Sequence, residues 1–346
     1  MTFRVRVRQL PAPLEVAAGQ TILDAALTAG YDYPCGCQSG NCGACKSVLL
    51  SGEIEMAPYS EFALTEAERT SGLILACRAV PWSEAEVAWL EPDEVAAHAQ
   101  RKLICRVVAI DAMTHDIRRV RLEIQSGGPF SFSAGQFASV TFDGLPPRDF
   151  SMASASDEAV LEFHIRAMAG GSVSHYVREK LRVGDRVRVA GPHGISYLRE
   201  KHAGPIVALA GGSGLAPIKA IVERALTLRL PQPISLYFGV RDERDLYLEE
   251  HFRALAARHN NLKFVPVLSE PSGQSTRRTG FLADVLAEDF ATLDGAKIYL
   301  AGPPIMVETC VAVAAKLGAR KEDCHADAFY TEADKAKLGL AELVTQ

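Results

Sequence analysis

Four cysteines have the spacing of iron–sulfur ligands. Cys37, Cys42 and Cys45 are separated by four and then two residues, and Cys77 follows much later in the chain. This C-x4-C-x2-C…C pattern is the one by which four thiolates hold a [2Fe–2S] cluster. We therefore predict that these four cysteines ligate such a cluster.

The segment that carries the first three cysteines is also rich in glycine. Gly36, Gly40 and Gly43 lie between or beside the cysteines. A negatively charged cluster requires backbone N–H groups that point at its sulfur atoms, so the chain has to wrap tightly around it. Glycine permits the positive φ angles that such wrapping needs, and we expect positive φ at these three positions.

Two other uses of these cysteines fit the sequence less well. A structural zinc site normally has two short cysteine pairs, whereas the fourth cysteine here stands alone. Disulfides are disfavoured because the chain carries no sign of secretion. We interpret Cys35 as a bystander beside the cluster loop. The cysteines that we expect to be reduced and packed are Cys105, Cys310 and Cys324.

The composition is that of a folded chain with several domains. Its 346 residues are 48% hydrophobic and 23% charged, which is typical of globular proteins and sufficient for two or three domains. The net charge of −5 argues against a general nucleic-acid binder. We find no signal peptide and no apolar run near the ~20 residues that cross a membrane. We therefore expect a cytoplasmic protein that binds neither nucleic acid nor membrane.

The elements around the cysteine loop predict a β-grasp domain. Apolar residues alternate with arginines over residues 3–7, which is the pattern of a strand with one buried face. A second strand is expected at 14–16, and Thr21 has the character of an N-cap before a short amphipathic helix. The cysteine loop follows this helix. Strands at 47–50 and 73–77 then lead away from the loop and return with the fourth cysteine.

An acidic stretch lies between these last two strands, with no basic residue before Arg69. One interpretation is a solvated face. The other is a docking surface for an electron-accepting partner, because complementary charge accelerates a transient encounter. The sequence leaves both open. The acidic residues are Glu53, Glu55, Glu61, Glu66 and Glu68.

The middle of the chain is rich in short strands with Gly and Pro turns. Strand patterns cover residues 104–110, 117–124 and 135–142, which indicates an antiparallel β-barrel. Two segments of this region could carry chemistry, namely 148–151 and the stretch from His164 to Ser174.

The last third of the chain alternates strands and helices. Residues 205–210 form an apolar run without alternation, which suits a strand buried on both faces of a parallel sheet. A glycine loop at 211–214 and a helix at 217–228 follow directly. A strand, a glycine turn and a helix in this order form a site where a pyrophosphate binds at a helix N-terminus. Further β and α elements predict an α/β doubly wound sheet with its ligand at the carboxyl ends of the strands.

These segments resemble a known family. The cysteine loop resembles plant-type ferredoxins. Arg148-x-Phe150-Ser151, Gly170-Gly171-Ser172 and Gly211-Gly212-Ser213-Gly214-Leu215-Ala216-Pro217 resemble flavin reductases of the ferredoxin–NADP reductase type. Three further segments, 114–119, 197–202 and 326–330, look like the reductase component of naphthalene-type aromatic-ring dioxygenases.

The resemblance implies a division of the chain into domains. The expected parts are a [2Fe–2S] ferredoxin domain at 1–92, a linker at 93–102, an FAD-binding barrel at 103–203, an NAD-binding α/β domain at 204–330 and a tail at 331–346. The tail carries Leu338, Leu340 and Leu343 among charged residues and is expected to be a short docked helix or a frayed end.

The resemblance also implies roles for single residues. Arg148 would pair with the flavin pyrophosphate, a task that suits a guanidinium, and Ser151 would reach the N5 edge of the flavin. Gly171 and Ser172 would begin a helix whose free N–H groups hold phosphate. The complete set implied for cofactor binding is Arg148, Phe150, Ser151, His164, Ile165, Arg166, Gly171, Ser172, Val173, Gly211, Gly212, Ser213, Gly214, Arg241, Gly302 and Pro303.

Three positions near the expected reaction centre need comment. Phe329 would cover the flavin face where the nicotinamide arrives, although burial in the core is an equally good interpretation of this aromatic residue. Ser151 and Phe329 are therefore our candidate catalytic residues. Phe150 stands where the family usually has Tyr, and Ala301 stands where it usually has Cys. These two departures lose a hydroxyl and a thiol contact.

The implied function is electron transfer. Nicotinamide gives up electrons in pairs, a [2Fe–2S] cluster accepts them singly, and a flavin can do both. Because Arg241 is followed by Asp242 and Glu243, and a carboxylate suits a free ribose diol, we favour NADH over NADPH.

The resemblance implies a partner as well. The expected client is an oxygenase or its ferredoxin, met in a transient contact, and most naturally a Rieske-type dioxygenase of aromatic hydrocarbon catabolism. We expect the reductase to be a monomer. Reductases of diiron monooxygenases or of deoxysugar biosynthesis, and an electron carrier with a degenerate reductase portion, remain alternatives.

Overall fold

The structure is a computed structural model that describes residues 1–91, 93, 94, 96, 98–155, 160–331, 334 and 336. The chain divides into two units. The first comprises residues 1–95 together with the chain from Tyr330, and the second comprises residues 96–329. No helix among the described residues has the length and apolarity to cross a membrane.

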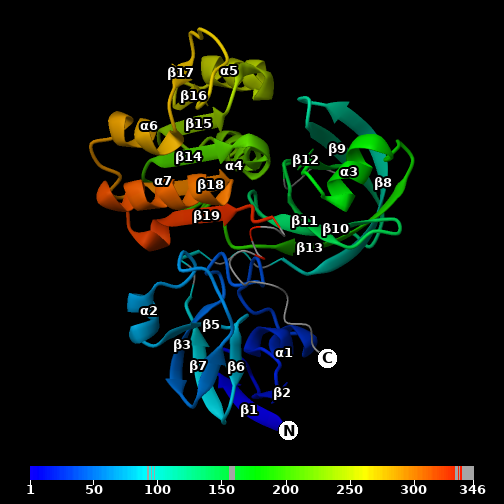
Figure 1. The fold of residues 1–346 in the computed structure, drawn as a ribbon, viewed down its shortest axis with the longest axis vertical. Coiled ribbons are helices and arrows are strands. Elements are labelled where there is room, and N and C mark those ends of the chain that lie inside the picture. The colour runs from blue at the N-terminus through cyan, green and yellow to red at the C-terminus, as the bar shows by residue number, and fades with distance from the viewer. Residues whose placement is uncertain are drawn as a thin grey trace. The chain divides into compact units, whose positions relative to one another are not determined.

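The first unit is built on a mixed five-stranded sheet with the order β2-β1-β7-β3-β5 (Figure 1). The pair β1–β7 is parallel, and the other pairs are antiparallel. The strands are β1 (Thr2–Val7), β2 (Leu14–Ala17), β3 (Lys46–Ser51), β5 (Leu73–Leu75) and β7 (Ala85–Trp89). This is the predicted β-grasp arrangement.

Short elements complete this unit. The helix α1 (Ile22–Thr28) begins after Thr21, whose side chain accepts a hydrogen bond from the Asp24 N–H at 3.1 Å, so the expected N-cap is confirmed. The strands β4 (Ile54–Met56) and β6 (Ala79–Pro81) form a separate two-stranded antiparallel sheet, and α2 (Glu66–Thr70) lies within the acidic stretch.

The first sheet of the second unit is antiparallel and nearly closed. Its strand order is β11-β10-β13-β8-β9-β12, and an isolated bridge between Met152 and Phe163 links its two ends. The strands are β8 (Arg101–Ala112), β9 (Ile117–Ser126), β10 (Phe137–Phe142), β11 (Arg148–Ser151), β12 (Val160–Arg166) and β13 (Arg186–His193). The helix α3 (Ser172–Glu179) packs on this barrel.

The second sheet of this unit is parallel throughout, with the order β17-β16-β15-β14-β18-β19 (Figure 1). Its strands are β14 (Ile206–Gly211), β15 (Ile234–Val240), β16 (Leu262–Leu268), β17 (Arg278–Thr279), β18 (Lys297–Gly302) and β19 (Cys324–Ala328). The helices are α4 (Leu215–Thr227), α5 (Glu249–Arg258), α6 (Leu282–Asp289) and α7 (Pro304–Lys316). Every residue of β14 is buried, as its continuous apolar pattern predicted.

Three local expectations differ from the structure. The strand β8 begins at Arg101, so the expected linker 93–102 ends inside a strand. The strand β5 ends at Leu75, so Cys77 lies in the turn after it and not in the strand itself. Within the expected tail 331–346 the structure describes only Thr331, Asp334 and Ala336, so Leu338, Leu340 and Leu343 lie outside the described residues.

Candidate functional site

The four predicted cluster ligands gather at one end of the first sheet. The thiol of Cys42 is the neighbour with the largest effect on the pKa of Cys37, and the thiol of Cys45 is the neighbour with the largest effect on that of Cys77. The four thiols therefore approach as two pairs, one within the loop and one between the loop and the turn after β5. A cluster of two irons that takes two thiolates at each iron fits this arrangement.

The backbone of the loop also points toward sulfur. The Asn41 N–H donates to the Cys37 Sγ at 3.2 Å, and the Cys37 N–H donates to the Cys42 Sγ at 3.3 Å. Hydrogen bonds from Cys42 and from the backbone at Ser39 and Asn41 outweigh burial and lower the pKa of Cys37 to about 5. The loop thus stabilises the thiolate of Cys37, the form that binds iron, whereas the neighbouring Cys37 and burial raise the pKa of Cys42.

The glycines of the loop have two different functions. Gly40 and Gly43 have positive φ angles of 80° and 74°, as expected, and Gln38 shares this conformation at 53°. Gly36 does not, so the expectation is wrong at that position. A Cβ on Gly36 would lie 3.0 Å from the Cys42 Sγ, so glycine is needed there for close approach to the sulfur.

Cys35 lies apart from the paired thiols in its chemistry. It packs against the core of the first unit, and burial raises the pKa of its thiol to about 12. It therefore stays protonated at neutral pH, and our interpretation of it as a bystander stands as a proposal.

The second unit places the proposed flavin residues on and beside β11. Arg148 is exposed, and its Nη1 donates to the neighbouring Pro147 carbonyl at 2.8 Å. Phe150 is half-buried against the barrel core. Ser151 is buried, and its Oγ donates to the Asp327 Oδ2 on β19 at 3.0 Å. An exposed cation, an aromatic ring and a hydroxyl within four residues are groups that would suit FAD.

The strand β12 has backbone groups, more than side chains, that are available to a flavin. Ile165 belongs to the barrel core, and His164 is buried. Arg166 is bound through its Nε to the Asp116 Oδ2 at 2.7 Å. Among the described strands, none pairs with the second edge of β12 at residues 164–166. A flavin could therefore bond to the free backbone groups of this edge.

The helix α3 begins at Ser172, with Gly171 as its N-cap, as expected. The side chain of Val173 lies in the barrel core, so only its backbone could serve a phosphate. The Ser174 Oγ accepts from the Met168 N–H at 3.0 Å and donates to the Gly171 carbonyl at 3.2 Å. These bonds hold the turn that precedes the helix.

The glycine loop and the end of β18 are pressed together at the carboxyl edge of the parallel sheet. A Cβ on Gly214 would lie 2.0 Å from the Ala301 carbonyl oxygen, and a Cβ on Gly302 would lie 2.9 Å from the Gly211 carbonyl oxygen. No side chain fits at either position. The two loops that would hold the dinucleotide thus form one surface, which continues through Ser213 at the start of α4 and Pro303 at the start of α7.

Phe329 follows β19 and lies beside this surface. Its backbone N–H donates to the Gly302 carbonyl at 2.9 Å, and its ring is half-buried against the core of the parallel sheet. The position next to Gly302 agrees with a ring at the nicotinamide end of the site. The core contact agrees with the second interpretation of this residue, so its role stays a prediction.

Arg241 lies farther away, at the end of β15, where it is exposed. The carboxylates of the next two residues, Asp242 and Glu243, already accept hydrogen bonds within the protein. Asp242 accepts from the N–H groups of Glu243 and Ser272 at 2.8 and 3.1 Å, and Glu243 accepts from Arg277 Nη1 at 2.8 Å.

Sequence reasoning missed the polar residues that join these segments. Asp327 binds Ser151, Asp116 binds Arg166, and Tyr247 binds His164. Asp116 and Asp327 lie inside segments that carry the family resemblance, so a signal for them existed. Tyr247 had none, because a tyrosine flanked by two leucines looks like any core residue.

Models of three protein families match the chain in order. The family described as "2Fe-2S iron-sulfur cluster binding domain" matches residues 5–81, "Oxidoreductase FAD-binding domain" matches 104–197, and "Oxidoreductase NAD-binding domain" matches 208–312.

Whole proteins match over nearly the full chain. The reductase component of the naphthalene 1,2-dioxygenase/salicylate 5-hydroxylase systems of Ralstonia sp is 41% identical over 94% of this chain and 98% of its own. The reductase component of the naphthalene 1,2-dioxygenase system of Pseudomonas putida is 38% identical over 91% of this chain and 94% of its own. The crystal structure of an Amycolatopsis cytochrome P450 reductase matches with a TM-score of 0.78 and 35% identity, over 95% of this chain and 99% of that one. The chain therefore belongs to the family of oxygenase-system reductase components, which are oxidoreductases with a [2Fe–2S], an FAD-binding and an NAD-binding domain.

Proposed function

We propose that this reductase takes electrons from NADH and delivers them to a Rieske-type aromatic-ring-hydroxylating dioxygenase or to its ferredoxin. The observation that carries the proposal is the similarity, over more than nine-tenths of the chain, to two reductase components of naphthalene dioxygenase systems. The electrons pass from NADH to FAD and from FAD to the [2Fe–2S] cluster.

The residues have separate tasks in this scheme. Bound FAD supplies the change from paired to single electrons. Arg148 neutralises its pyrophosphate, Phe150 and the edge of β12 hold it in place, and the Ser151–Asp327 pair places a hydrogen-bonding group where the parallel sheet meets the barrel. Cys37, Cys42, Cys45 and Cys77 hold the cluster. Phe329 and the loop at Gly302 position the nicotinamide.

NADH is the favoured donor because the surroundings of Arg241 hold little uncompensated positive charge. Arg277, a further cation of this region, is bound by Glu249 and Glu243 at 2.9 and 2.8 Å. A 2′-phosphate would meet the exposed cations Arg241 and Arg244 together with the carboxylates of Asp242 and Glu243. We expect a higher kcat/KM for NADH than for NADPH, with Arg241→Ala reducing what activity NADPH supports.

A second client class is favoured by one observation. The matched crystal structure with a TM-score of 0.78 is a cytochrome P450 reductase, so the same three-domain scaffold can serve a haem oxygenase. The chain would then feed a P450 in place of a Rieske centre.

The decisive experiment is reconstitution. Purified reductase should contain one FAD and one [2Fe–2S] cluster per chain, and NADH should bleach both in the visible spectrum. It should then support product formation by a Rieske dioxygenase of the naphthalene type. Zinc in place of iron, or no bleaching with NADH, would refute the electron-transfer scheme. Product with a P450 but none with the Rieske enzyme would select the second client.

The contact with the client would use the first unit. Glu68 is unavailable for it, because its carboxylate caps α2 and binds Lys46 at 2.7 Å. The acidic residues that remain for docking are Glu53, Glu55, Glu61 and Glu66, all of them exposed. We propose a monomer in the cytoplasm, whose reducing conditions keep the buried thiols of Cys105 and Cys310 free.

A further inference from the structure

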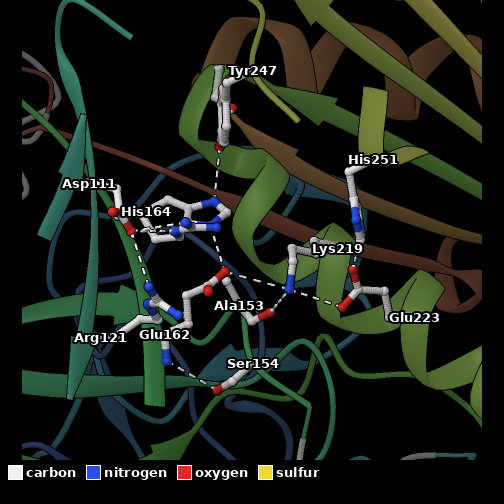
Figure 2. Close-up of polar contacts among 12 residues, drawn as sticks. Asp111, Arg121, Ala153, Ser154, Glu162, His164, Lys219, Glu223, Tyr247 and His251 are labelled. Atoms are coloured by element: carbon white, nitrogen blue, oxygen red, sulfur yellow. Dashed lines mark hydrogen bonds and ion pairs between the residues drawn. The ribbon is translucent and has the colours of Figure 1, made fainter. Parts of the chain in front are cut away.

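The hydroxyl of Tyr247 lies between a barrel strand and the glycine loop. Its oxygen is 3.0 Å from the Nδ1 of His164 on β12 and 3.4 Å from the carbonyl oxygen of Gly212. Both side chains are buried. Figure 2 shows Tyr247 pointing at His164, which in turn contacts Glu162.

The hydrogen-bond donors among Tyr247, His164 and Glu162 can be assigned. Burial alone would raise the pKa of Glu162, but His164 and Lys219 outweigh it and lower that pKa to about 2, so the carboxylate is ionised. Its Oε1 accepts from the His164 Nε2 at 3.1 Å. Burial lowers the pKa of His164, so the ring is neutral and its Nδ1 accepts. Tyr247 therefore donates to His164, with the Gly212 carbonyl as its second, longer acceptor.

The position of Tyr247 is fixed from several sides. Its ring contacts Phe238 of β15 and His164 edge-on, with centroid distances of 5.5 and 5.3 Å. The next residue, Leu248, has φ of 55°, a conformation that is uncommon for a non-glycine residue. The chain adopts it directly after Tyr247 and before α5 begins at Glu249.

Glu162, the charged member of this hydrogen-bonded row, is held in place as well (Figure 2). The Nζ of Lys219 on α4 lies 3.5 Å from the Glu162 carboxylate and donates to the Ala153 carbonyl at 2.9 Å. Glu223 accepts from the same Nζ at 2.9 Å and bonds to the His251 Nε2 at 2.6 Å. Because α4 is the helix that follows the glycine loop, the loop is bound to the barrel from both of its ends.

Gly212 itself is contacted a second time from β12. Its φ is 54°, and a Cβ at this position would lie 3.2 Å from the Arg166 Nη1. His164 and Arg166 are two residues apart on one strand, so their side chains share a face. That face therefore lies close to Gly212 at Arg166 and reaches the Gly212 carbonyl through Tyr247.

We infer that Tyr247 is a positioning residue for the nicotinamide dinucleotide. It does not touch the dinucleotide but orients it by fixing the glycine loop against β12. The inference rests on the proposed role of residues 211–214 in dinucleotide binding. With the Gly212 carbonyl held, the N–H groups at the start of α4 face the bound pyrophosphate in one fixed arrangement. Without the hydroxyl, the loop also adopts other arrangements that do not bind the pyrophosphate. The apparent dissociation constant of the dinucleotide then rises in inverse proportion to the fraction of molecules that keep the binding arrangement.

The test compares two buried tyrosines, Tyr247 in the loop before α5 and Tyr237 on β15. Tyr247→Phe removes the hydroxyl that reaches the loop. Tyr237→Phe is the matched control, because the Tyr237 hydroxyl donates to Asp289 at 2.6 Å and has no contact with the glycine loop. The dissociation constant of NAD⁺ is measured by calorimetry on the FAD- and cluster-containing protein, together with the KM and kcat of ferricyanide reduction, the flavin spectrum and the thermal midpoint.

We expect Tyr247→Phe to weaken NAD⁺ binding by about 5- to 10-fold, the equivalent of one buried hydrogen bond, and to raise the KM for NADH with little change in kcat. The flavin spectrum should stay the same. Tyr237→Phe should lower the thermal midpoint and leave the NAD⁺ dissociation constant unchanged. An NAD⁺ dissociation constant within twofold of wild type in Tyr247→Phe would overturn the inference.

Two variants of His164 test the same contact independently. An asparagine amide occupies the place of the imidazole Nδ1, whereas a glutamine amide occupies that of Nε2. His164→Asn should therefore keep the partner of Tyr247 and bind NAD⁺ more tightly than His164→Gln, which should resemble Tyr247→Phe. The reverse order of affinities would refute the positioning role. Failure of the wild-type protein to bind NAD⁺ would instead refute the proposed dinucleotide site.

Discussion

The cluster loop and the barrel–sheet junction solve the same problem, the placement of a redox group, in opposite ways. Three of the four cluster ligands come from nine consecutive positions, and backbone N–H groups and glycine turns arrange them. The junction instead assembles residues from β11, β12, the glycine loop, β18 and β19 through buried side-chain contacts. The first site is therefore determined locally, and the second depends on the whole unit being folded.

Loss of one cluster ligand should give the largest effect. We expect Cys42→Ser to abolish reduction of cytochrome c, a one-electron acceptor, while ferricyanide reduction by NADH through the flavin continues. The reason is that the loop lies in the first unit and the flavin residues lie in the second. Parallel assays of both acceptors measure it. An equal loss of both activities would show that the cluster loop also supports the second unit.

A methyl group in the glycine loop should come next. Gly214→Ala places a Cβ 2.0 Å from the Ala301 carbonyl oxygen, and the two backbones have to separate. We expect a loss of ~2–3 kcal/mol in the free energy of unfolding, or roughly 5–10 °C in the thermal midpoint for a unit of this size, together with weaker NADH binding. Gly273→Ala is the control, since nothing lies within 4 Å of its Cβ. Similar melting curves for the two variants would contradict the close approach.

Phe329→Ala separates the two interpretations of this ring. Because the ring is half-buried, we expect a loss of about 1–2 kcal/mol, below the ~3–5 kcal/mol of a fully buried Phe→Ala change. If the ring also covers the flavin, the affinity for NAD cofactors and the flavin absorbance band should change. A thermal melt and a flavin spectrum decide it. An unchanged spectrum with a large loss of stability would place Phe329 in the core alone.

The smallest effect is a dependence of stability on pH. Burial lowers the pKa of His164, and its environment lowers that of Glu162 to about 2. Both groups bind protons more readily when unfolded, so the stability that they contribute is full at neutral pH. It decreases below about pH 6.5 for the histidine and below about pH 4.3 for the glutamate. Denaturant unfolding of wild type and His164→Gln between pH 7 and 5 should show the shallower slope in the variant.

The sequence predicted best what a single segment encodes. The cysteine spacing, the Thr21 N-cap and the buried strand β14 depend on neighbours in the chain. The positive φ of Gln38 and the close contact at Gly36 were missed, because both depend on where the sulfur atoms lie.

The junction was predicted only in outline. Family resemblance identified β11, the glycine loop and Gly302, but the partners that connect them are separated by up to 176 positions, as Ser151 and Asp327 are. The helix and strand periodicities of a sequence do not indicate contacts between residues so far apart. The role of His164 in cofactor binding stays a prediction, and the contact of its side chain with Tyr247 was not foreseen, because a strand residue's partner is decided by what packs on it.

The pairing of Cys45 with Cys77 sets the order in which the first unit can mature. Lys46 at the start of β3 pairs with Leu75 at the end of β5, and this pairing brings the turn that holds Cys77 to Cys45. Before β3 and β5 pair, bringing Cys77 to Cys45 has an entropic cost, because the chain between them must close into a loop. The unfolded chain therefore holds no preformed metal site. Iron and sulfide should therefore enter after the sheet has formed, and the cluster then acts as a staple that resists the separation of β3 from β5.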